Sequence, residues 1–363
     1  MSTPVVAKEP ATHDLLIGIA ENHNADALVL SSLPDIRWAT GFSGSNGLLI
    51  VHPDRLIFLS DGRYTEQAQR EVTNAEIHTP GYALWEYVEE KSLFGDVSSV
   101  LVQADKVTVK TLHSWRERFP DIRWEEGSGL LTAHRGAKSE REVEKMRDAQ
   151  AITDTVFSEL CEWIEPGMTE REVSARIVYQ HLLHGADKMS FDPIVASGPN
   201  GALPHARPSD RVLREGELVV IDMGCFLQGY ASDMTRTIAL GEPSDEARAV
   251  YNVVLEAQEA SLQAARSGIT GTDIDRVART IIEEAGYGDY FGHGLGHGVG
   301  LEIHEWPRLS YHVSHNLPAN AAVTVEPGIY LPDKFGVRIE DLIILHPDGH
   351  ENLTQSPKAL QIL

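Results

Sequence analysis

A two-copy internal repeat is the feature of this sequence that most limits the folds it can adopt. In each copy, a long helical segment, a Gly-x-Thr turn and a second helical segment lead to a histidine and then to two carboxylates on apolar strands. The turns are Gly167–Thr169 and Gly268–Thr270. Two copies are too few for a solenoid. The repeat therefore predicts two α/β halves that face each other across a pseudo-twofold axis, with the carboxylates meeting in the middle.

Helix signals place the elements of this repeat. Two capping boxes, Ser139 with Glu142 and Thr169 with Glu172, open helices that are expected to run to about residues 164 and 184. The corresponding helices of the second copy are expected over 246–267 and 273–285.

Each copy ends in a predicted β-hairpin that carries one carboxylate on either strand. The pairs are Asp222 with Asp233 and Glu326 with Glu340, and the segments VVID, VTVE and VRIEDLII are apolar enough to be central strands. Facing carboxylates repel each other, and burying an unpaired charge costs still more. One such pair could lie on a solvent-exposed face, but the repetition favours burial. Four buried carboxylates require roughly four positive charges, which two divalent metal ions would supply.

A glycine-rich stretch, FGHGLGHGVGLEIHE at 291–305, supplies candidate histidine ligands. It contains His293, His297 and His304, and its glycines let the backbone approach a bound group closely. A lone histidine is more often a hydrogen-bonded structural residue than a ligand, whereas three in one such stretch before a carboxylate strand favour a site. The HExxH motif of single-zinc proteases is absent.

The part of the chain before the repeat is expected to form a separate mixed α/β domain. Strands are predicted over 27–31, 47–51, 55–59 and 100–103, together with an amphipathic helix over 13–24 and a helix capped by Asp61. Residues 134–138 are interpreted as a linker. The expected domains are 1–133 and 139–363, since 363 residues suit about two domains.

Composition limits the partners and the compartment. The 31 Lys and Arg against 54 Asp and Glu give a net charge of −23, which repels nucleic-acid phosphates. No run of about 18 apolar residues predicts a membrane span, and the N-terminus lacks a signal-peptide pattern. Cys161 and Cys225 are too few for a disulfide framework and suit a reducing compartment, so a cytoplasmic location is expected.

These motifs together resemble a known family. The ordered set IDMG, SDMTRT, GHGVGLEIHE, TVEPGIY and VRIED is similar to the pita-bread metallopeptidases, which include aminopeptidase P, prolidase and methionine aminopeptidase. The segments WATGFSGSNG and LSDGRYTEQA resemble the N-terminal domain of the proline-specific members, which methionine aminopeptidases lack. The resemblance implies an α/β (α+β) fold class, with a creatinase-like α/β domain over 1–133 and a pita-bread catalytic domain over 139–363.

Matched residue by residue, the resemblance implies a dinuclear metal centre. Asp222 would hold one ion, His297 with Glu326 would hold the other, and Asp233 with Glu340 would bridge the two. Four carboxylates and one imidazole favour manganese, with cobalt or zinc as alternatives. No ligand position is substituted, which argues against a non-catalytic peptide-binding protein on the same fold.

The remaining implied roles concern the substrate. His205 and His304 match histidines that touch the substrate, and Glu326 would also take the proton from the attacking water. The implied substrate-binding residues of the pocket are His293, Arg338 and Tyr330. Arg338 offers a bidentate fork that could bind a carboxylate.

The activity expected from the resemblance is that of an Xaa-Pro aminopeptidase, in which a hydroxide held between two metal ions attacks the bond before proline. The alternative within the class is an Xaa-Pro dipeptidase (prolidase), because the two share every metal ligand. Substrates are therefore expected to be peptides with proline at the second position. A homo-oligomer, such as a homodimer, is expected, with no nucleic-acid or membrane partner.

Overall fold

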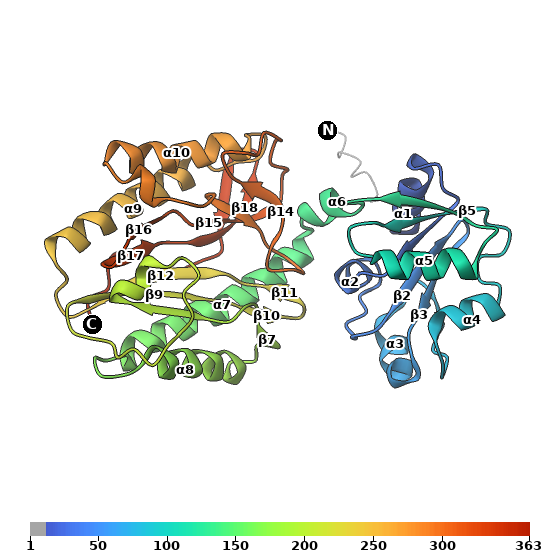
Figure 1. Ribbon diagram of the computed structural model, residues 1–363, viewed down its shortest axis with the longest axis horizontal. Helices are drawn as coiled ribbons and strands as arrows, with labels where there is room; N and C mark the ends of the chain where they lie inside the picture. Colours follow the sequence, from blue (N-terminus) through green and yellow to red (C-terminus); the bar gives the residue numbers. More distant parts are fainter. Residues whose placement is uncertain (1–11) are drawn as a thin grey trace, which may run out of the picture. The chain divides into compact units, whose positions relative to one another are not determined.

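The computed structural model describes residues 12–363, which form two compact units, residues 12–133 and His134–Leu363 (Figure 1). The segment that lacks a signal-peptide pattern lies largely outside the described residues. Among residues 12–363, no helix combines the length and apolarity that crossing a membrane requires.

The first unit is built on a six-stranded mixed sheet in the order β4-β3-β2-β1-β5-β6. Its strands are β1 (Ala27–Leu30), β2 (Leu48–His52), β3 (Arg55–Leu59), β4 (Glu76–His78), β5 (Ser99–Gln103) and β6 (Arg123–Gly127). Its helices are α1 (Thr12–Asn22), α2 (Leu33–Thr40), α3 (Thr65–Glu71), α4 (Leu84–Glu90) and α5 (Val109–Arg118), with a 3₁₀ turn η1 (Gly62–Tyr64) that Asp61 caps.

Alternation along the central strands sends side chains into two cores. Leu28 and Leu30 of β1 pack with α1, α2 and α3 on one face of the sheet, whereas Ala27 and Val29 pack with α4 and α5 on the other. Because successive side chains of a strand point to opposite faces, a strand covered on both sides reads as a continuous apolar run. The segment ALVL is such a run, and this is why its strand was predictable.

The second unit follows α6 (Thr132–Gly136), which crosses the boundary between the units. Its helices are α7 (Glu140–Trp163), α8 (Glu170–Leu183), α9 (Asp245–Ala264) and α10 (Gly271–Glu284), with 3₁₀ turns η2 (Gly198–Ala202) and η3 (Gly288–Tyr290). The strands of its first half are β7 (Lys188–Met189), β8 (Ile194–Ser197), β9 (Glu217–Met223), β10 (Cys225–Leu227), β11 (Tyr230–Ala231) and β12 (Met234–Leu240). Those of its second half are β13 (Gly296–Gly298), β14 (Glu305–Leu309), β15 (Ala322–Val325), β16 (Gly328–Leu331), β17 (Phe335–Arg338), β18 (Asp341–His346) and β19 (Gly349–Asn352).

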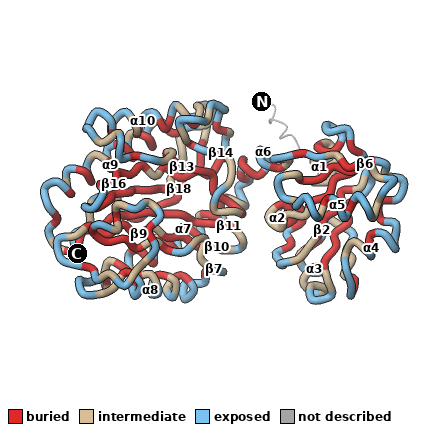
Figure 2. Tube along the Cα trace, in the orientation of Figure 1, coloured by how far each residue is buried: buried red, intermediate tan, exposed pale blue. Residues whose placement is uncertain are grey.

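The two predicted halves are present in this unit. In Figure 1, α7 and α8 lie on one side of the central strands, and α9 and α10 lie on the other. One core joins α7 and α8 to β8, β9 and β12, and another joins α9 and α10 to β15 through β18. Figure 2 shows the strands between these helices as buried. The predicted α/β class, with its paired halves, is confirmed.

Local signals placed the helices of the first half correctly. Both predicted capping boxes form, with Ser139 and Glu142 at the start of α7 and Thr169 and Glu172 at the start of α8. A capping box satisfies backbone N–H groups that have no partner within the helix. The helix start therefore depends on residues only three positions apart, and a sequence pattern can locate it.

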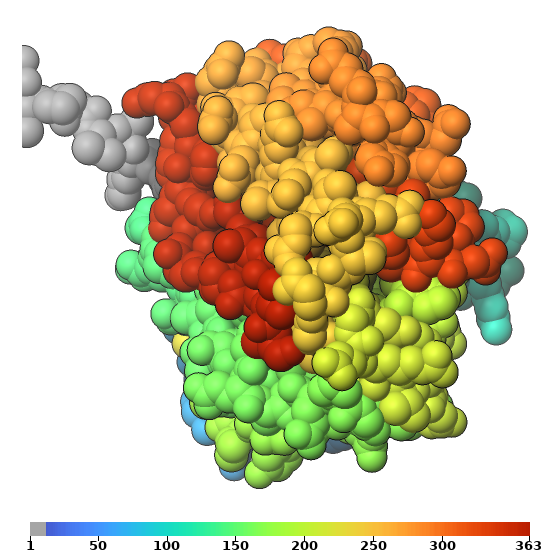
Figure 3. Space-filling view, turned by 90° about the vertical axis from the view of Figure 1, so that its left-hand side faces the viewer, coloured from blue at the N-terminus to red at the C-terminus, as the bar shows by residue number. Residues whose placement is uncertain are grey.

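The C-terminal segment joins the two halves. Asp154 of α7 accepts hydrogen bonds from the backbone N–H groups of Gln355 at 3.0 Å and Ser356 at 2.8 Å. Tyr251 of α9 donates its hydroxyl proton to the carbonyl oxygen of Lys358 at 2.7 Å. In Figure 3, the dark red C-terminal residues lie on the surface between the green helices of the first half and the gold helix of the second. The backbone of residues 355–358 therefore forms hydrogen bonds with both α7 and α9.

Two glycines form another junction between the halves. Gly201 in η2 packs against Gly336 of β17, and a Cβ added at Gly336 would overlap the carbonyl oxygen of Gly201. The chain runs from η2 into the loop that carries His205. This close backbone contact therefore seats the His205 loop of the first half on the second hairpin.

Residues 134–138 are not the linker that the sequence suggested. Arg135 and Lys138 are buried, with 7% and 3% of their surfaces exposed, and Ala137 forms an isolated β-bridge with Ala321. Short polar segments usually run over the surface as connections. Here the polar side chains are buried because they find ionic partners far along the chain, which a local pattern does not reveal.

Candidate active site

The four predicted carboxylates lie on two β-hairpins whose registers differ. The β15–β18 and β16–β17 pairings share one register, which puts Glu326 directly opposite Glu340. In the other hairpin Asp222 is opposite Thr235, so Asp233 is its diagonal neighbour on the same face. The turn of this hairpin is centred between Gln228 and Gly229, one residue beyond the midpoint between Asp222 and Asp233.

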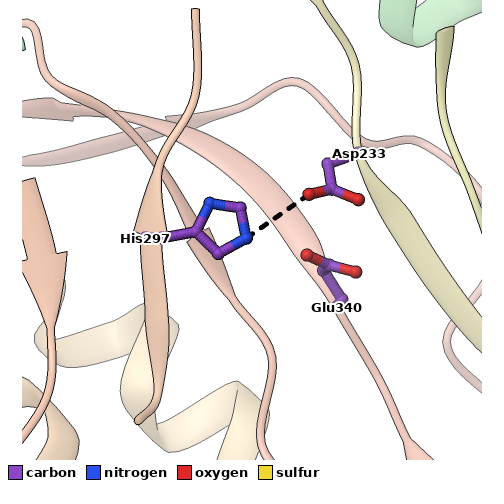
Figure 4. Close-up of side chains that lie close together, drawn as sticks. All are labelled: Asp233, His297 and Glu340. Carbon is purple, nitrogen blue, oxygen red and sulfur yellow. Dashed lines mark ion pairs between the residues drawn. The ribbon is translucent and has the colours of Figure 1, made fainter. Parts of the chain in front are cut away.

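Three of the expected ligand residues converge at the middle of the unit. One ligand atom from each of Asp233, His297 and Glu340 lies within 4.8 Å of the others, and all three residues are buried. Figure 4 shows their side chains pointing toward one another from separate segments of the chain. Nε2 of His297 is 3.5 Å from Asp233 Oδ2 and 3.3 Å from Glu326 Oε1. The structure therefore brings residues from both hairpins and from β13 into one cluster.

The imidazole of His297 presents a lone pair to this cluster. Its Nδ1 lies 3.1 Å from the carbonyl oxygen of Gly298, which can only accept, so Nδ1 carries the proton. Burial, with the nearby His304, lowers the pKa of His297 to about 3, which leaves Nε2 unprotonated. A lone pair that faces two carboxylate oxygens is repelled by them. A cation bound between these atoms removes that repulsion, and a second-sphere hydrogen bond of this kind is typical of metal-ligating histidines.

The carboxylates themselves are short of positive charge. Burial raises the pKa of Asp233 and of Glu340 well above the ordinary values, and the neighbouring carboxylates raise them further. Burial also raises the pKa of Glu326 to about 7. The second oxygen of Asp222, Oδ1, is buried and accepts no hydrogen bond within the described part of the chain. These oxygens and the free His297 nitrogen fit a hard divalent cation.

Two threonines that the sequence did not single out orient these carboxylates. Thr235 donates its hydroxyl proton to Glu340 Oε2 at 2.7 Å and accepts from Arg338 Nε at 3.0 Å. Thr324 donates to Glu326 Oε1 at 3.0 Å and accepts from the backbone N–H of His297, also at 3.0 Å. The position of Thr324 follows from strand geometry, since it is two residues before Glu326 and points to the same face. Without the register, nothing marks Thr235 as a neighbour of Glu340.

A hydrogen-bonded chain backs one side of the cluster. Arg338, which is 3% exposed, donates from Nη2 to Asp222 Oδ2 at 2.7 Å and from Nη1 to the Tyr330 hydroxyl at 2.8 Å. The Tyr330 hydroxyl is 2.9 Å from Nε2 of His293, whose Nδ1 donates to the Gly294 carbonyl. Tyr330 therefore donates to His293. The guanidinium of Arg338 is already held by protein groups, so it is poorly placed to bind a substrate carboxylate.

A cavity of about 620 Å³ opens onto the cluster, within the size range of small-molecule sites. Its lining includes all five expected ligands together with His205, His293, His304 and Arg338, whereas Tyr330 lies behind His293 and does not line it. The rings of His304 and His297 are in contact, with their centroids 4.4 Å apart. Histidines from both halves thus line a single cavity: His205 comes from the first half, and His293, His297 and His304 come from the second.

Two arginines of this cavity were not identified from the sequence. Arg207 and Arg308 both line it, and both side chains are exposed. Arg308 is opposite His297 in the β13–β14 pairing and helps, after burial, to lower the pKa of His304. Within residues 12–363, no carboxylate forms an ion pair with Arg308. Only the strand pairing shows that Arg308 lies beside His297. The sequence does not predict this pairing, because β14 is short and carries no apolar alternation.

Family models match both parts of the chain. The model of the Creatinase/Prolidase N-terminal domain matches residues 13–136, and the model of metallopeptidase family M24 matches residues 144–347. The two matches meet near the boundary between the compact units.

Similar proteins extend over nearly the whole chain. An Xaa-Pro dipeptidase of Pyrococcus horikoshii is 34% identical over 345 residues, which covers 95% of this chain and 97% of the relative. The structure of an Xaa-Pro dipeptidase from Bacillus anthracis superposes with a TM-score of 0.94 at 38% identity, covering 97% of this chain and 99% of that one. The structure of an X-Pro aminopeptidase from Thermotoga maritima gives a TM-score of 0.90 at 35% identity, covering 95% and 100%.

Proposed function

The chain belongs to metallopeptidase family M24, and on that premise we propose that it is an Xaa-Pro dipeptidase. Membership confirms the resemblance predicted from the motifs, and a metal-dependent hydrolase as the class of enzyme. Aminopeptidase activity was the first expectation and dipeptidase activity its alternative. Dipeptidases recur among the similar proteins, in both sequence and structure, so the alternative has the better support.

The observation that carries the proposal is the position of Arg308. A dipeptidase must recognise the free carboxylate of the second residue, and it requires a cation at a fixed distance from the reacting carbonyl. Arg308 is opposite His297 on the neighbouring strand, lines the cavity, and is an exposed residue. A bidentate arginine–carboxylate pair adds geometric specificity as well as energy. We propose that Arg308, rather than Arg338, binds the proline carboxylate of the substrate.

The metal ligands of this proposal are Asp222, Asp233, His297, Glu326 and Glu340. Two divalent ions bound there would supply Lewis acidity and the activation of water at neutral pH. The protein's part is to hold the carboxylates ionised and oriented, through Thr235 and Thr324, and to keep Nε2 of His297 unprotonated. Manganese is the proposed metal, because the donor set is rich in carboxylate oxygens.

The protein's own proton-transfer and donor groups complete the proposed chemistry. Glu326, whose pKa is raised to about 7, is suited to accept a proton from water and return it to the leaving nitrogen. His205 and His304 line the cavity and carry N–H groups that would stabilise the oxyanion. His293, held by Tyr330, would contact the substrate from the wall of the cavity.

The proposal is tested by comparing a matched pair of peptides, Ala-Pro and Ala-Pro-Ala, with the manganese-loaded protein. We expect a higher kcat/KM for the dipeptide. Arg308→Gln should raise the KM for Ala-Pro by roughly 10- to 100-fold, the value of one charge-assisted hydrogen bond, and should leave the tripeptide nearly unaffected. Arg207→Gln is the matched control, because it removes the other arginine of the cavity.

A second candidate function is that of an Xaa-Pro aminopeptidase, which the relative from Thermotoga maritima supports at 35% identity. A kcat/KM for Ala-Pro-Ala at least equal to that for Ala-Pro would favour this activity and contradict the dipeptidase assignment. An Arg308→Gln variant with an unchanged preference would contradict the assigned role of that arginine.

The remaining expectations stay predictions. We propose a homo-oligomer, to be tested by light scattering of the purified chain. A cytoplasmic location is proposed from the two cysteines, both of which are free thiols.

A further inference from the structure

A buried ion cluster lies beside the segment that carries His304. Glu305 is 8% exposed at its side chain and contacts two cations. Lys138 Nζ donates to Glu305 Oε1 at 2.6 Å, and Arg135 donates to Glu305 Oε2. Lys138, 1% exposed at its side chain, also donates to the carbonyl oxygen of Arg135 at 2.5 Å. Arg135 forms a second ion pair with Glu302 at 2.9 Å.

Backbone contacts hold the cluster tightly on both sides. The backbone N–H of Lys138 donates to the carbonyl oxygen of Asn320 at 2.8 Å. A Cβ added at Gly136 would overlap the ring of Trp306, and one added at Gly300 would overlap the carboxylate of Glu305. The segment from 135 to 138 and the start of β14 are therefore packed so closely that neither can shift alone.

His304 has little of its own to hold it in place. It lies in an irregular segment between β13 and β14, and none of the described residues forms a hydrogen bond with its ring. The ring of His304 contacts the ring of His297 edge to face, with the centroids 4.4 Å apart. The direction of its imidazole is therefore set by the backbone, and Glu305, the next residue, is the first anchored position of that backbone.

A net gain in the free energy of unfolding does not by itself account for burying these ions. Burying a salt bridge costs several kcal/mol of desolvation per ion, and replacing such a pair with apolar residues is often neutral or stabilising. What a buried, fully partnered carboxylate does provide is one fixed arrangement of the chain. Here that arrangement fixes the residue next to a histidine of the cavity wall.

We propose that Glu305, clamped by Arg135 and Lys138, is a positioning residue that sets the imidazole of His304 for its role in the reaction. The inference rests on the proposed function, since His304 must act on a substrate for its position to matter. Arg135 and Lys138 belong to the segment first interpreted as a linker, so that segment takes part in shaping the site.

A double-mutant cycle between Glu305 and His304 tests the proposal, with Ala-Pro as substrate. Glu305→Gln should lower kcat by roughly 10- to 100-fold, as expected for a small displacement of a catalytic group, with KM and bound metal nearly unchanged. In the His304→Ala background the same substitution should change kcat by less than about twofold, because the group that it positions is gone. Equal losses in both backgrounds would overturn the proposal.

Hydrogen–deuterium exchange supplies a readout that does not depend on activity. Glu305→Gln should speed exchange in residues 299–305 while leaving α7 and α9 protected, and unchanged exchange in 299–305 would overturn the positioning role. Glu351→Gln, which breaks the partly exposed pair with Arg147, is the control and should alter neither exchange in 299–305 nor kcat. If Glu305→Gln does not fold, Lys138→Gln enters the same cycle, with the same expected outcomes.

A parent protein inactive on Ala-Pro would refute the proposed function, while the exchange result would still decide the positioning of the segment.

Discussion

Three of the four carboxylates of the candidate site accept a hydrogen bond from a buried neighbouring side chain. Thr235 bonds to Glu340 and Thr324 to Glu326, while Arg338 bonds to Asp222. These contacts direct the acceptor oxygens and leave the site with more negative charge than one guanidinium can balance. The protonation of the cluster must therefore change when a divalent cation enters.

Metal binding should release protons near neutral pH. Burial raises the pKa of Glu326 to about 7 and those of Asp233 and Glu340 well above normal, so the metal-free cluster carries protons that a cation displaces. Calorimetric titration with Mn²⁺ in buffers of different ionisation enthalpy measures this release, which should shrink as the pH rises above 7. Glu326→Gln should release fewer protons than the parent, and binding without proton release at pH 7 would contradict the prediction.

The raised pKa of Glu326 also determines how the free energy of unfolding changes with pH. Because the folded-state pKa of Glu326 exceeds its ordinary value of 4.5, folded metal-free protein binds more protons than the unfolded chain between these values. This contribution to the free energy of unfolding is fully present below pH 4.5 and is lost as the pH rises through about 7. Bound metal removes the effect.

Hairpin turns decide which carboxylates face each other. Gln228 and Gly229 have φ values of 50° and 86°, as a two-residue type I′ turn requires. This turn sets the register of the first hairpin and makes the Asp222–Asp233 pair diagonal. The sequence located both hairpins, but a turn placed midway between Asp222 and Asp233 would be one residue too early. One residue of slip changes every cross-strand pair.

Substitutions in this turn should change stability in opposite directions. Gln228→Asn should raise the free energy of unfolding by up to about 1 kcal/mol, because asparagine tolerates positive φ better than glutamine. Gly229→Val should lower it by about 1–2 kcal/mol, because a β-branched side chain is strained there. Urea unfolding of the metal-free protein measures both. A destabilised Gln228→Asn variant would argue against the type I′ geometry.

Elements predicted from local chemistry were found, and those that depend on distant partners were not. The capping boxes at Ser139 and Thr169 and the apolar run ALVL involve neighbours in sequence, so their helices and strand were predictable. The burial of Arg135 and Lys138 depends on Glu305, which lies far along the chain. The cavity position of Arg308 likewise depends on a strand pairing across β13 and β14.

At the scale of the whole molecule, the two units have separate interiors. The cores of the first unit are made of residues between 16 and 131, and those of the second of residues between 149 and 345. All five proposed metal ligands belong to the second unit. Stability therefore need not be shared between the units.

Heating should unfold the units in two transitions, of which only one responds to metal. A ligand that binds only the folded state stabilises it by RT ln(1 + [L]/Kd), about 2.7 kcal/mol at a hundredfold excess over Kd. Calorimetry with and without Mn²⁺ should move the transition of the second unit upward and leave the other in place. Asp233→Asn should abolish most of the shift. A single transition that moves as a whole would show that the units unfold together.

The contact between Gly201 and Gly336 has a consequence for how this protein can vary. The atoms that a Cβ at Gly336 would overlap most are the backbone carbonyl atoms of Gly201, so no rotamer change can absorb an added methyl group there. A side chain at Gly336 therefore requires the backbone to move, whereas one at Gly201 meets a tight contact; neither glycine lines the cavity. A change at one glycine cannot be rescued by a smaller residue at the other, because none exists. Changes to the cavity are therefore expected at its lining residues, while Gly336 stays a glycine that keeps this junction closed.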